Sequence, residues 1–272
     1  MPITADFHMH SSHSGDSSTP MEQMIQQAIQ TGMTQMCFTE HQDFDYPSSD
    51  EIPADYFLLN TDAYLYDLIR LRQKYEDKIR IFFGVELGLQ PHLAEKHERY
   101  VDSFDFDFVI GSSHVCHDQD PYYPSFYAER SEEEAYREYF EYILENIRSF
   151  HNFDVYGHLD YVVRYGPSQD KYYTYDRYRD IFDAILELLL ELGKGLELNT
   201  GGLKYGLSQP NPCLAILKRY RRMGGDIITI GSDAHRPEQI GYAFVRAAEV
   251  LKECGFSHYT TFQNRRPKYH RL

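Results

Sequence analysis

The stretch DFHMHSSHSGD, residues 6–16, places three histidines and two aspartates directly behind a short apolar segment. That segment, ITADFH at residues 3–8, has the length and apolar character of a buried strand. His8 and His10 therefore stand where the strand ends, and their HxH spacing lets both imidazoles turn toward one ion as the chain leaves the sheet. We interpret the stretch as one wall of a metal site, and this interpretation depends on what the other strands carry at their ends.

Strand-like segments recur along the chain, and each is followed by a helical pattern. Six further strands are predicted at residues 35–39, 79–86, 106–111, 153–157, 195–199 and 226–231. One helix is expected to begin with Thr19 as its cap and Pro20 at its first position, and another with Ser131 and Glu134 as a capping box. Two more helical patterns end at glycine, at residues 175–193 and 236–255.

This alternation of short buried strands and longer helices is typical of a parallel sheet. Seven strands, with an eighth candidate at residues 259–263, favour a closed barrel over an open doubly wound sheet, and no GxGxxG motif follows the first strand. Neither an internal repeat nor a low-complexity linker divides the chain. We therefore expect one α/β barrel domain over residues 1–272.

The composition bounds the class of protein. A hydrophobic fraction of 42% over 272 residues is that of a folded protein, and the formal net charge of −15 disfavours binding to nucleic acid. The four cysteines, Cys37, Cys116, Cys213 and Cys254, form no CxxC pair, which favours a reducing compartment. No signal-peptide pattern is present, and the longest apolar run, residues 184–193, is too short and too acidic to span a bilayer. We expect a cytoplasmic protein that does not bind membranes.

Ligand-type side chains stand at nearly every predicted strand end. In a parallel barrel these ends ring one mouth, the face where barrel enzymes keep their chemistry. A single histidine there is more often hydrogen-bonded than a ligand, and Asp160 and Asp233 each suit a helix cap. Scatter would rarely produce the whole set, however, and histidine with carboxylate ligands suits zinc, manganese or iron. The set comprises His8, His10, Asp16, Glu40, His41, Glu86, His114, His158, Asp160, Asn199, Asp233 and His235.

Taken in chain order, the motifs HMH, EH, a lone Glu, SSH, GHLD and SDAH resemble those of the PHP (polymerase and histidinol phosphatase) superfamily. The resemblance covers most of the chain and implies a distorted (β/α)7 barrel, similar to a TIM barrel, with the metal site at the carboxyl ends of its strands. Within the superfamily, GHLDYVVRYGP, LELNTGGLKYG and SDAHRPEQIG are similar to segments of the stand-alone L-histidinol-phosphate phosphatases.

The resemblance also implies how two to three divalent ions would be held. Many family members carry a histidine where Asp16 stands, and a carboxylate there still coordinates but alters the third site. The implied ligands are His8, His10, Glu86 and Asp233 for the first ion, Glu86, His114 and His158 for the second, and Asp16, His41 and His235 for the third.

The implied reaction is hydrolysis of L-histidinol phosphate, a step of histidine biosynthesis, by a hydroxide that bridges two ions. Arg164 is our first candidate for a fork-like contact to the phosphate, weighed evenly against a surface salt bridge. Asn199, Lys204 and Arg236 are further candidates for contacts to the substrate.

Two roles are less defined. The proton donor to the leaving alkoxide stays open among Asp160, His117 and a metal-bound water. The candidate acceptors for the substrate amine are acids of two long connections, residues 42–60 and 115–130, that have the length of lids. They are Asp43, Asp45 and Asp118, with Tyr122 and Tyr123 nearby.

Two other functions remain as alternatives. One is a PHP-type phosphoesterase or exonuclease acting on nucleotides, against which the negative charge counts. The other is a non-catalytic metal-binding barrel, against which the completeness of the ligand set counts. Oligomeric state is not readable from the sequence.

Overall fold

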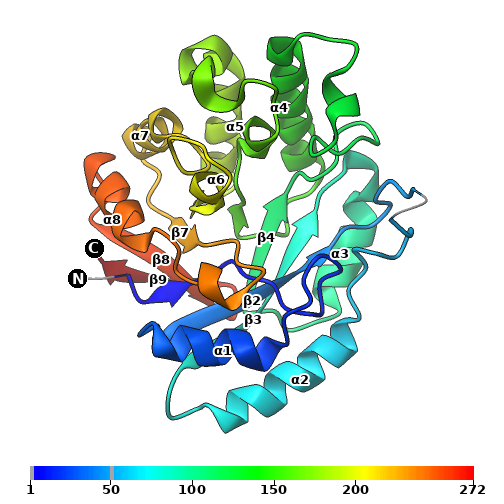
Figure 1. Cartoon of the computed structure of the whole chain (residues 1–272). Helices are drawn as coiled ribbons and strands as arrows, with labels where there is room; N and C mark the ends of the chain where they lie inside the picture. Colours follow the sequence, from blue (N-terminus) through cyan, green and yellow to red (C-terminus); the bar gives the residue numbers. More distant parts are fainter. Residues whose placement is uncertain (1–2, 50–51) are drawn as a thin grey trace.

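The computed structural model describes residues 3–49 and 52–272, and its centre is a seven-stranded sheet (Figure 1). Each strand pairs in parallel with the next along the chain, as the alternating pattern predicts. Each of the seven predicted segments overlaps one strand, and three strands run past the predicted ends. The strands are β1 (Ala5–Asp6), β2 (Gln35–Gln42), β3 (Arg80–Gly88), β4 (Phe108–Ser112), β5 (Val155–Tyr156), β6 (Gly195–Asn199) and β7 (Ile228–Gly231).

Hydrogen bonds between the first and last strands nearly close this sheet into a barrel. The backbone N–H of Phe7 donates to the carbonyl of Ile230 at 3.0 Å, and the N–H of Asp233 donates to the carbonyl of His8 at 2.9 Å. The buried carboxylate of Asp6 strengthens the seam, because it accepts hydrogen bonds from the backbone and hydroxyl of Ser232. The expected α/β barrel is confirmed, and its closure brings the ends of β1 and β7 together.

Helices surround the barrel and bury its outer face (Figure 1). The α-helices are α1 (Met21–Gln30), α2 (Thr61–Lys74), α3 (Ala94–Asp102), α4 (Glu132–Ser149), α5 (Arg179–Glu191), α6 (Gly201–Lys204), α7 (Leu214–Arg222) and α8 (Phe244–Glu253). Short 3-10 helices lie at Pro91–Leu93, Pro124–Tyr127, Tyr161–Arg164, Gln169–Lys171, Tyr175–Tyr178 and Pro237–Gln239. The capping box of Ser131 and Glu134 at α4 is confirmed. In the part of the chain that the structure describes, no helix is both long and apolar enough to cross a membrane.

Three predicted elements differ from the structure. The candidate eighth barrel strand is wrong: β8 (His258–Gln263) pairs antiparallel with β9 (Arg266–Arg271) in a separate hairpin. Helix α1 has Pro20 rather than Thr19 as its N-cap, because the Thr19 hydroxyl donates instead to the carbonyl of His235. The helix expected over residues 236–255 begins only at Phe244.

Gly241 explains the late start of α8. Its backbone has a positive φ of 65°, and its N–H donates to the Asp6 carboxylate at 2.9 Å. A Cβ at this position would meet only the end of the flexible Met33 side chain, so the positive φ, which L side chains rarely adopt, is what favours glycine here. The requirement to close the barrel seam therefore overrides the helical pattern.

The two long connections meet over the carboxyl ends of the strands. The hydroxyl of Tyr46, in residues 42–60, donates to the carboxylate of Asp120, in residues 115–130, at 2.5 Å. Residues 50 and 51 of the first connection lie outside the described part of the chain. The connections thus share a buried contact above the barrel mouth.

Candidate metal centre

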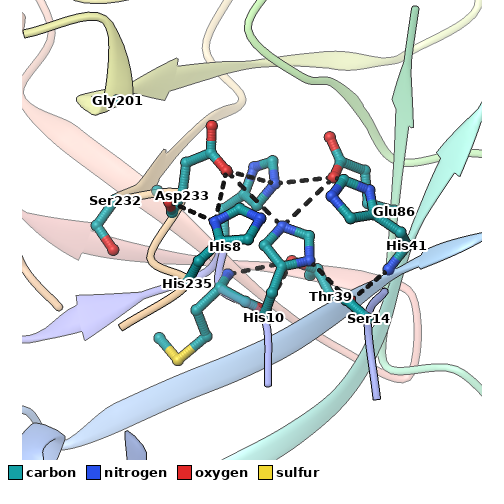
Figure 2. A network of polar contacts seen from close by, with 12 residues as sticks. His8, His10, Ser14, Thr39, His41, Glu86, Gly201, Ser232, Asp233 and His235 are labelled. Carbon is teal, nitrogen blue, oxygen red and sulfur yellow. Dashed lines mark hydrogen bonds and ion pairs between the residues drawn. The ribbon is translucent and has the colours of Figure 1, made fainter. Parts of the chain in front are cut away.

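The barrel brings all nine predicted metal ligands to its mouth. His41 and Glu86 belong to β2 and β3, while the other seven stand on the segments that follow the strand ends. Figure 2 shows imidazoles from three separate segments converging with the carboxylates of Glu86 and Asp233 on one small region. Parallel strands produce this convergence, since their carboxyl ends all open on the same face.

Glu86 is the centre of the inner group. Its Oε1 lies 2.9 Å from His158 Nε2 and 3.2 Å from His114 Nε2. Its Oε2 lies 3.2 Å from His8 Nε2 and 3.1 Å from His41 Nδ1. One buried carboxylate therefore faces four imidazoles, which is the geometry that a bridging ligand between ions requires.

Asp16 forms the outer group with two histidines. Its Oδ2 lies 3.0 Å from His235 Nε2 and 3.5 Å from His41 Nε2. The ring of His10 packs against both, with its centroid 4.1 Å from that of His41 and 4.2 Å from that of His235. The outer group is thus continuous with the inner one.

The polar atoms that face this region fit divalent cations. Several are buried and have no hydrogen-bond partner among the described residues, a condition that costs about 1–3 kcal/mol for each atom. Imidazole nitrogens and carboxylate oxygens left in this state are the donors that zinc and related ions use. The unpartnered atoms are His8 Nε2, His10 Nε2, His41 Nδ1, Asp43 Oδ2, Glu86 Oε2, His158 Nδ1 and His235 Nε2.

The electrostatics of the centre favour exchange of protons for metal. Burial would lower the pKa of His8, but Glu197, Glu86 and Asp233 raise it well above its usual range. Burial likewise opposes the effect of Asp43 and Glu86 on His114, whose pKa rises to about 10. A divalent ion supplies the same positive charge and leaves the imidazoles neutral, so metal binding would release protons from this cluster.

Three further side chains orient the histidines. Glu197 lies 2.6 Å from His8 Nδ1, and the Ser14 hydroxyl lies 3.1 Å from His10 Nδ1. Asp43 Oδ1 lies 2.6 Å from His114 Nδ1. These contacts direct the Nε2 atoms of His8, His10 and His114 toward the centre. Residues that hydrogen-bond the second ring nitrogen of a metal-bound histidine usually act in this way.

Sequence reasoning missed the orienting role of these residues. Glu197 lies within β6, two residues before Asn199, and the alternation of that strand turns both side chains into the barrel. Asp43 is buried beside His114 at the wall of the inner cavity, and its role as an acceptor for the substrate amine stays a prediction. Glu197 could have been predicted to face the barrel interior, because residues two apart in a strand, such as Glu197 and Asn199, lie on the same face. The orientation of Asp43 depends on the fold of its loop.

Arg164 is buried at the edge of the centre. Its guanidinium donates to Asp233 Oδ2, to Asn199 Oδ1 and to Asn211 Oδ1, each at 2.8 Å. The ion pair with Asp233 is internal, so a surface salt bridge is wrong for this residue. Three of the five N–H groups of an arginine are used in this way, and two remain.

The centre opens into two connected spaces that share lining residues. The inner cavity is about 80 Å³ in volume and the outer one about 720 Å³. Both are lined by Tyr46, Phe57, Asp120, Tyr161, Tyr165 and Tyr205, among others. Burial raises the pKa of Asp120, against the opposing hydrogen bond from Tyr46. Asp120 and the tyrosines are candidate substrate contacts that sequence reasoning missed, because they stand on loops without strand or helix periodicity.

The structure does not bring two predicted residues to these cavities. Both carboxylate oxygens of Asp160 are engaged elsewhere, Oδ1 with Asn211 Nδ2 at 2.5 Å and Oδ2 with the N–H of Cys213 at 2.9 Å. His117 lies on the surface, with its side chain 57% exposed and its ring against Tyr142. Neither residue lines a cavity at the centre, so neither is placed to protonate a leaving group.

The remaining predicted contacts lie around the opening. Lys204 and Arg236 line the outer cavity. The ammonium group of Lys204 donates to the backbone carbonyl of Asp233 at 2.6 Å, while Arg236 is exposed. Asn199 lies deeper and holds Arg164 in place.

Comparisons with known proteins agree with this geometry. The family model of the PHP domain matches residues 6–201. The histidinol-phosphatase of Lactococcus lactis subsp. lactis is 35% identical over 258 residues, which cover 94% of this chain and 93% of that protein. A crystal structure of the histidinol phosphate phosphatase of the same organism, in complex with zinc, L-histidinol and phosphate, superposes with a TM-score of 0.87 at 33% identity. That match covers 97% of this chain and 98% of the other. A putative histidinol phosphatase of Listeria monocytogenes, 17% identical with a TM-score of 0.73, shares the fold; the match covers 89% of this chain and 99% of that chain.

Proposed function

Since the chain belongs to the PHP domain family, we propose that it is a metal-dependent phosphatase that hydrolyses L-histidinol phosphate to L-histidinol and phosphate. The observation that carries the proposal is the mouth itself, where unpartnered imidazole and carboxylate atoms converge beside a buried arginine. The Lactococcus lactis relatives, similar over almost the whole chain, support the choice of substrate.

The convergent atoms support one set of residues as the ligands of the ions. Divalent ions at these positions supply Lewis acidity toward the phosphate and a nucleophile at neutral pH. The proposed ligands are those of the inner group, His8, His10, Glu86, His114, His158 and Asp233, and those of the outer group, Asp16, His41 and His235.

Arg164 would bind the phosphate group. Its contacts to Asp233, Asn199 and Asn211 fix the plane of the guanidinium. The two N–H groups left on its terminal nitrogens can meet two phosphate oxygens, and a charge held rigidly in a buried site acts more strongly than one in water. Asn199 therefore serves the substrate through Arg164. Lys204 and Arg236 are placed to attract the anionic phosphate at the entrance.

Asp120 would bind the cationic part of the substrate. It is the buried acid of the outer cavity that lies on the lid connections, and tyrosine rings line the same space. An amine is stabilised both by a carboxylate and by the faces of aromatic rings. This arrangement favours a small phosphate ester with a positive charge over a nucleotide, whose base and sugar carry no positive charge for the acid to bind.

The setting of the enzyme follows from the same features. All four cysteines are free and buried, which supports a reducing compartment, and we place the enzyme in the cytoplasm. The partner is a small molecule, without nucleic acid or membrane.

The test is phosphate release from L-histidinol phosphate, nucleotides, short oligonucleotides and p-nitrophenyl phosphate by the purified protein. We expect a kcat/KM of about 10⁴ M⁻¹s⁻¹ or more for L-histidinol phosphate and much lower values for the others. Preferential release from nucleotides or oligonucleotides would favour the nucleotide-directed alternative. Absence of any hydrolysis by metal-loaded protein would favour the non-catalytic barrel.

The variant Asp120→Asn tests substrate recognition separately. We expect its KM for L-histidinol phosphate to rise about tenfold, the effect of losing about 1.4 kcal/mol of binding, while kcat stays nearly constant. p-Nitrophenyl phosphate has no amine and is the matched control, so its kinetics should not change. An equal effect on both substrates would refute the assignment of Asp120 to the amine.

A further inference from the structure

Three ligand-type side chains meet at a second place in the molecule, outside the barrel mouth. They are Cys116 and His117, at the start of the 115–130 connection, and Glu138 in α4. One donor atom from each lies within 4.8 Å of the other two. None of the three lines either cavity of the metal centre, so this cluster has no role in the proposed phosphatase reaction.

The spacing fits an ion better than a direct hydrogen bond. His117 Nε2 lies 3.9 Å from Glu138 Oε1, which is too far for a hydrogen bond. In a tetrahedral site with bonds of about 2.0–2.1 Å, two nitrogen or oxygen ligands stand roughly 3.4 Å apart. A small inward movement of the exposed His117 side chain would close the difference.

Glu138 is already oriented for this role. Its Oε2 is paired with the guanidinium of Arg130, while Oε1 is the oxygen that faces His117. The carboxylate can therefore keep its ion pair and still offer one oxygen to a metal. Arg130 also donates to the carbonyl of Phe126 and to the side chain of Gln119, so its own position is fixed. Ligating carboxylates are commonly held by such an outer hydrogen bond.

The other two ligands are held by a tight turn. The backbone N–H of Cys116 donates to the carbonyl of Gln119 at 2.8 Å, and the reverse bond is 3.1 Å long. Cys116 is buried, and its thiol makes no hydrogen bond to the described residues. His117 is 57% exposed, so an ion has a path from solvent.

We propose that Cys116, His117 and Glu138 form a binding site for a zinc-type divalent ion, separate from the catalytic centre. A thiolate ligand selects zinc, cobalt or cadmium over magnesium, calcium or manganese. Three protein ligands leave a fourth position for water, and binding releases the thiol proton to solvent. The ion would tie the 116–119 turn, which directly precedes Asp120, to α4.

Cobalt absorption tests this proposal without reference to activity. None of the nine residues proposed for the catalytic centre is a cysteine, so a thiolate-to-cobalt charge-transfer band in the near ultraviolet reports only a cysteine site. Titration of the manganese-loaded enzyme, in which the thiolate site stays free for cobalt, with cobalt chloride should produce this band in a saturable way, and added zinc should abolish it. A wild-type protein without the band, or a band that zinc does not displace, would overturn the proposal.

Variants identify the ligands. Cys116→Ser should remove the band, whereas Cys254→Ser, at a buried cysteine outside this cluster, should retain it. His117→Ala changes an exposed side chain and carries the test even if the cysteine variant does not fold; it should weaken cobalt binding at least about tenfold, as should Glu138→Gln. A band that persists in Cys116→Ser, or unchanged affinity in the other two variants, would show that this cluster is not the site.

Discussion

Both ends of the barrel bury carboxylates, but the hydrogen bonding around them differs. At the amino ends of the strands, Asp107 accepts hydrogen bonds from the N–H of Phe83 at 3.0 Å and of Asn264 at 3.1 Å. Asp154 accepts from Val109 and pairs with Arg265 at 2.6 Å. At the carboxyl ends, by contrast, buried imidazole and carboxylate atoms have no hydrogen-bond partner among the described residues.

This difference shows how to distinguish buried polar residues that stabilise the fold from those that serve a functional site. A buried acid that accepts hydrogen bonds from several elements holds the chain together, as Asp107 and Asp154 join β3, β4 and the β8–β9 hairpin. Buried carboxylates and imidazoles that face one another without hydrogen-bond donors between them are stabilised when a cation binds there. Both ends bury carboxylates, and the mouth differs in its histidines and in the polar atoms that lack a hydrogen-bond partner among the described residues.

The largest effect is expected from Glu86→Gln at the mouth. Glu86 faces four imidazoles, and its replacement removes the charge that we propose to bridge two ions. We expect kcat/KM for L-histidinol phosphate to fall at least about 10³-fold, which corresponds to roughly 4 kcal/mol of transition-state stabilisation. Bound metal per chain, measured by elemental analysis, should fall in parallel, and circular dichroism should report an unchanged fold. Retention of more than a tenth of the activity would contradict a central role for Glu86.

The sequence was sufficient to predict this mouth because strand ends can be located from residue pattern alone. Each of the seven strand segments was identifiable, and parallel order forces their carboxyl ends onto one face, which brings residues as distant as His8 and Asp233 together. Loop residues obey no such rule. Asp120 rather than its neighbour Asp118 lines the cavity because of a local turn that no periodicity reveals.

The misplacement of Asp160 has a similar physical origin. It follows β5, as a ligand would, but its carboxylate turns toward Asn211 and Cys213 and anchors the segment before α7. The direction of one side chain after a two-residue strand depends on tertiary partners from a distant part of the sequence. Position along the chain predicts which end of the barrel a residue occupies, and not which way it points.

At the opposite end, Arg265→Ala should lower stability and leave catalysis intact. The variant leaves Asp154 buried with only its backbone hydrogen bond, and breaking such a pair costs about 3 kcal/mol. Urea denaturation measures this loss in the free energy of unfolding. Arg265→Lys is the matched control and should recover part of the loss because it keeps the charge. A decrease in kcat/KM comparable to that of Glu86→Gln would break the separation between the two ends.

Glu197→Gln tests a residue that is intermediate between the structural acids and the metal ligands. Glu197 is hydrogen-bonded within the protein, but one of its partners is a proposed metal ligand, His8. It contacts His8 Nδ1 at 2.6 Å and accepts from the N–H of His158 at 2.9 Å. We expect metal affinity to fall about 10–100-fold, as for other residues that orient metal-bound histidines. Competition with a zinc-buffering chelator gives the affinity, and excess zinc should restore most of the activity. Unchanged affinity would show that His8 needs no such support.

The last comparison concerns His97, a buried histidine without hydrogen-bond partners among the described residues that lines neither cavity of the mouth. Both its ring nitrogens are unsatisfied, and it packs between Phe44 and Phe150 instead of facing carboxylates within bonding distance. Burial lowers its pKa to about 4, so it stays neutral in the folded protein at physiological pH. His97 is therefore an unsatisfied polar group that binds no metal. Its burial only makes protonation of the imidazole unfavourable in the folded protein.

The sign of that cost can be measured. The pKa of His97 is about 4 in the folded protein and near 6.5 in the unfolded chain, so the unfolded chain binds more protons between these two pH values. The contribution of His97 to stability is therefore complete above pH 6.5 and is lost as the pH falls toward 4. Between pH 7 and pH 5 this amounts to about 2 kcal/mol. Urea unfolding at the two pH values should show a loss in the wild type that is smaller by this amount in His97→Leu and in His97→Gln, at equal metal loading. If the wild type and both variants lose stability equally, His97 is hydrated or partnered in solution, and lack of a partner would then mark the metal centre alone among these histidines.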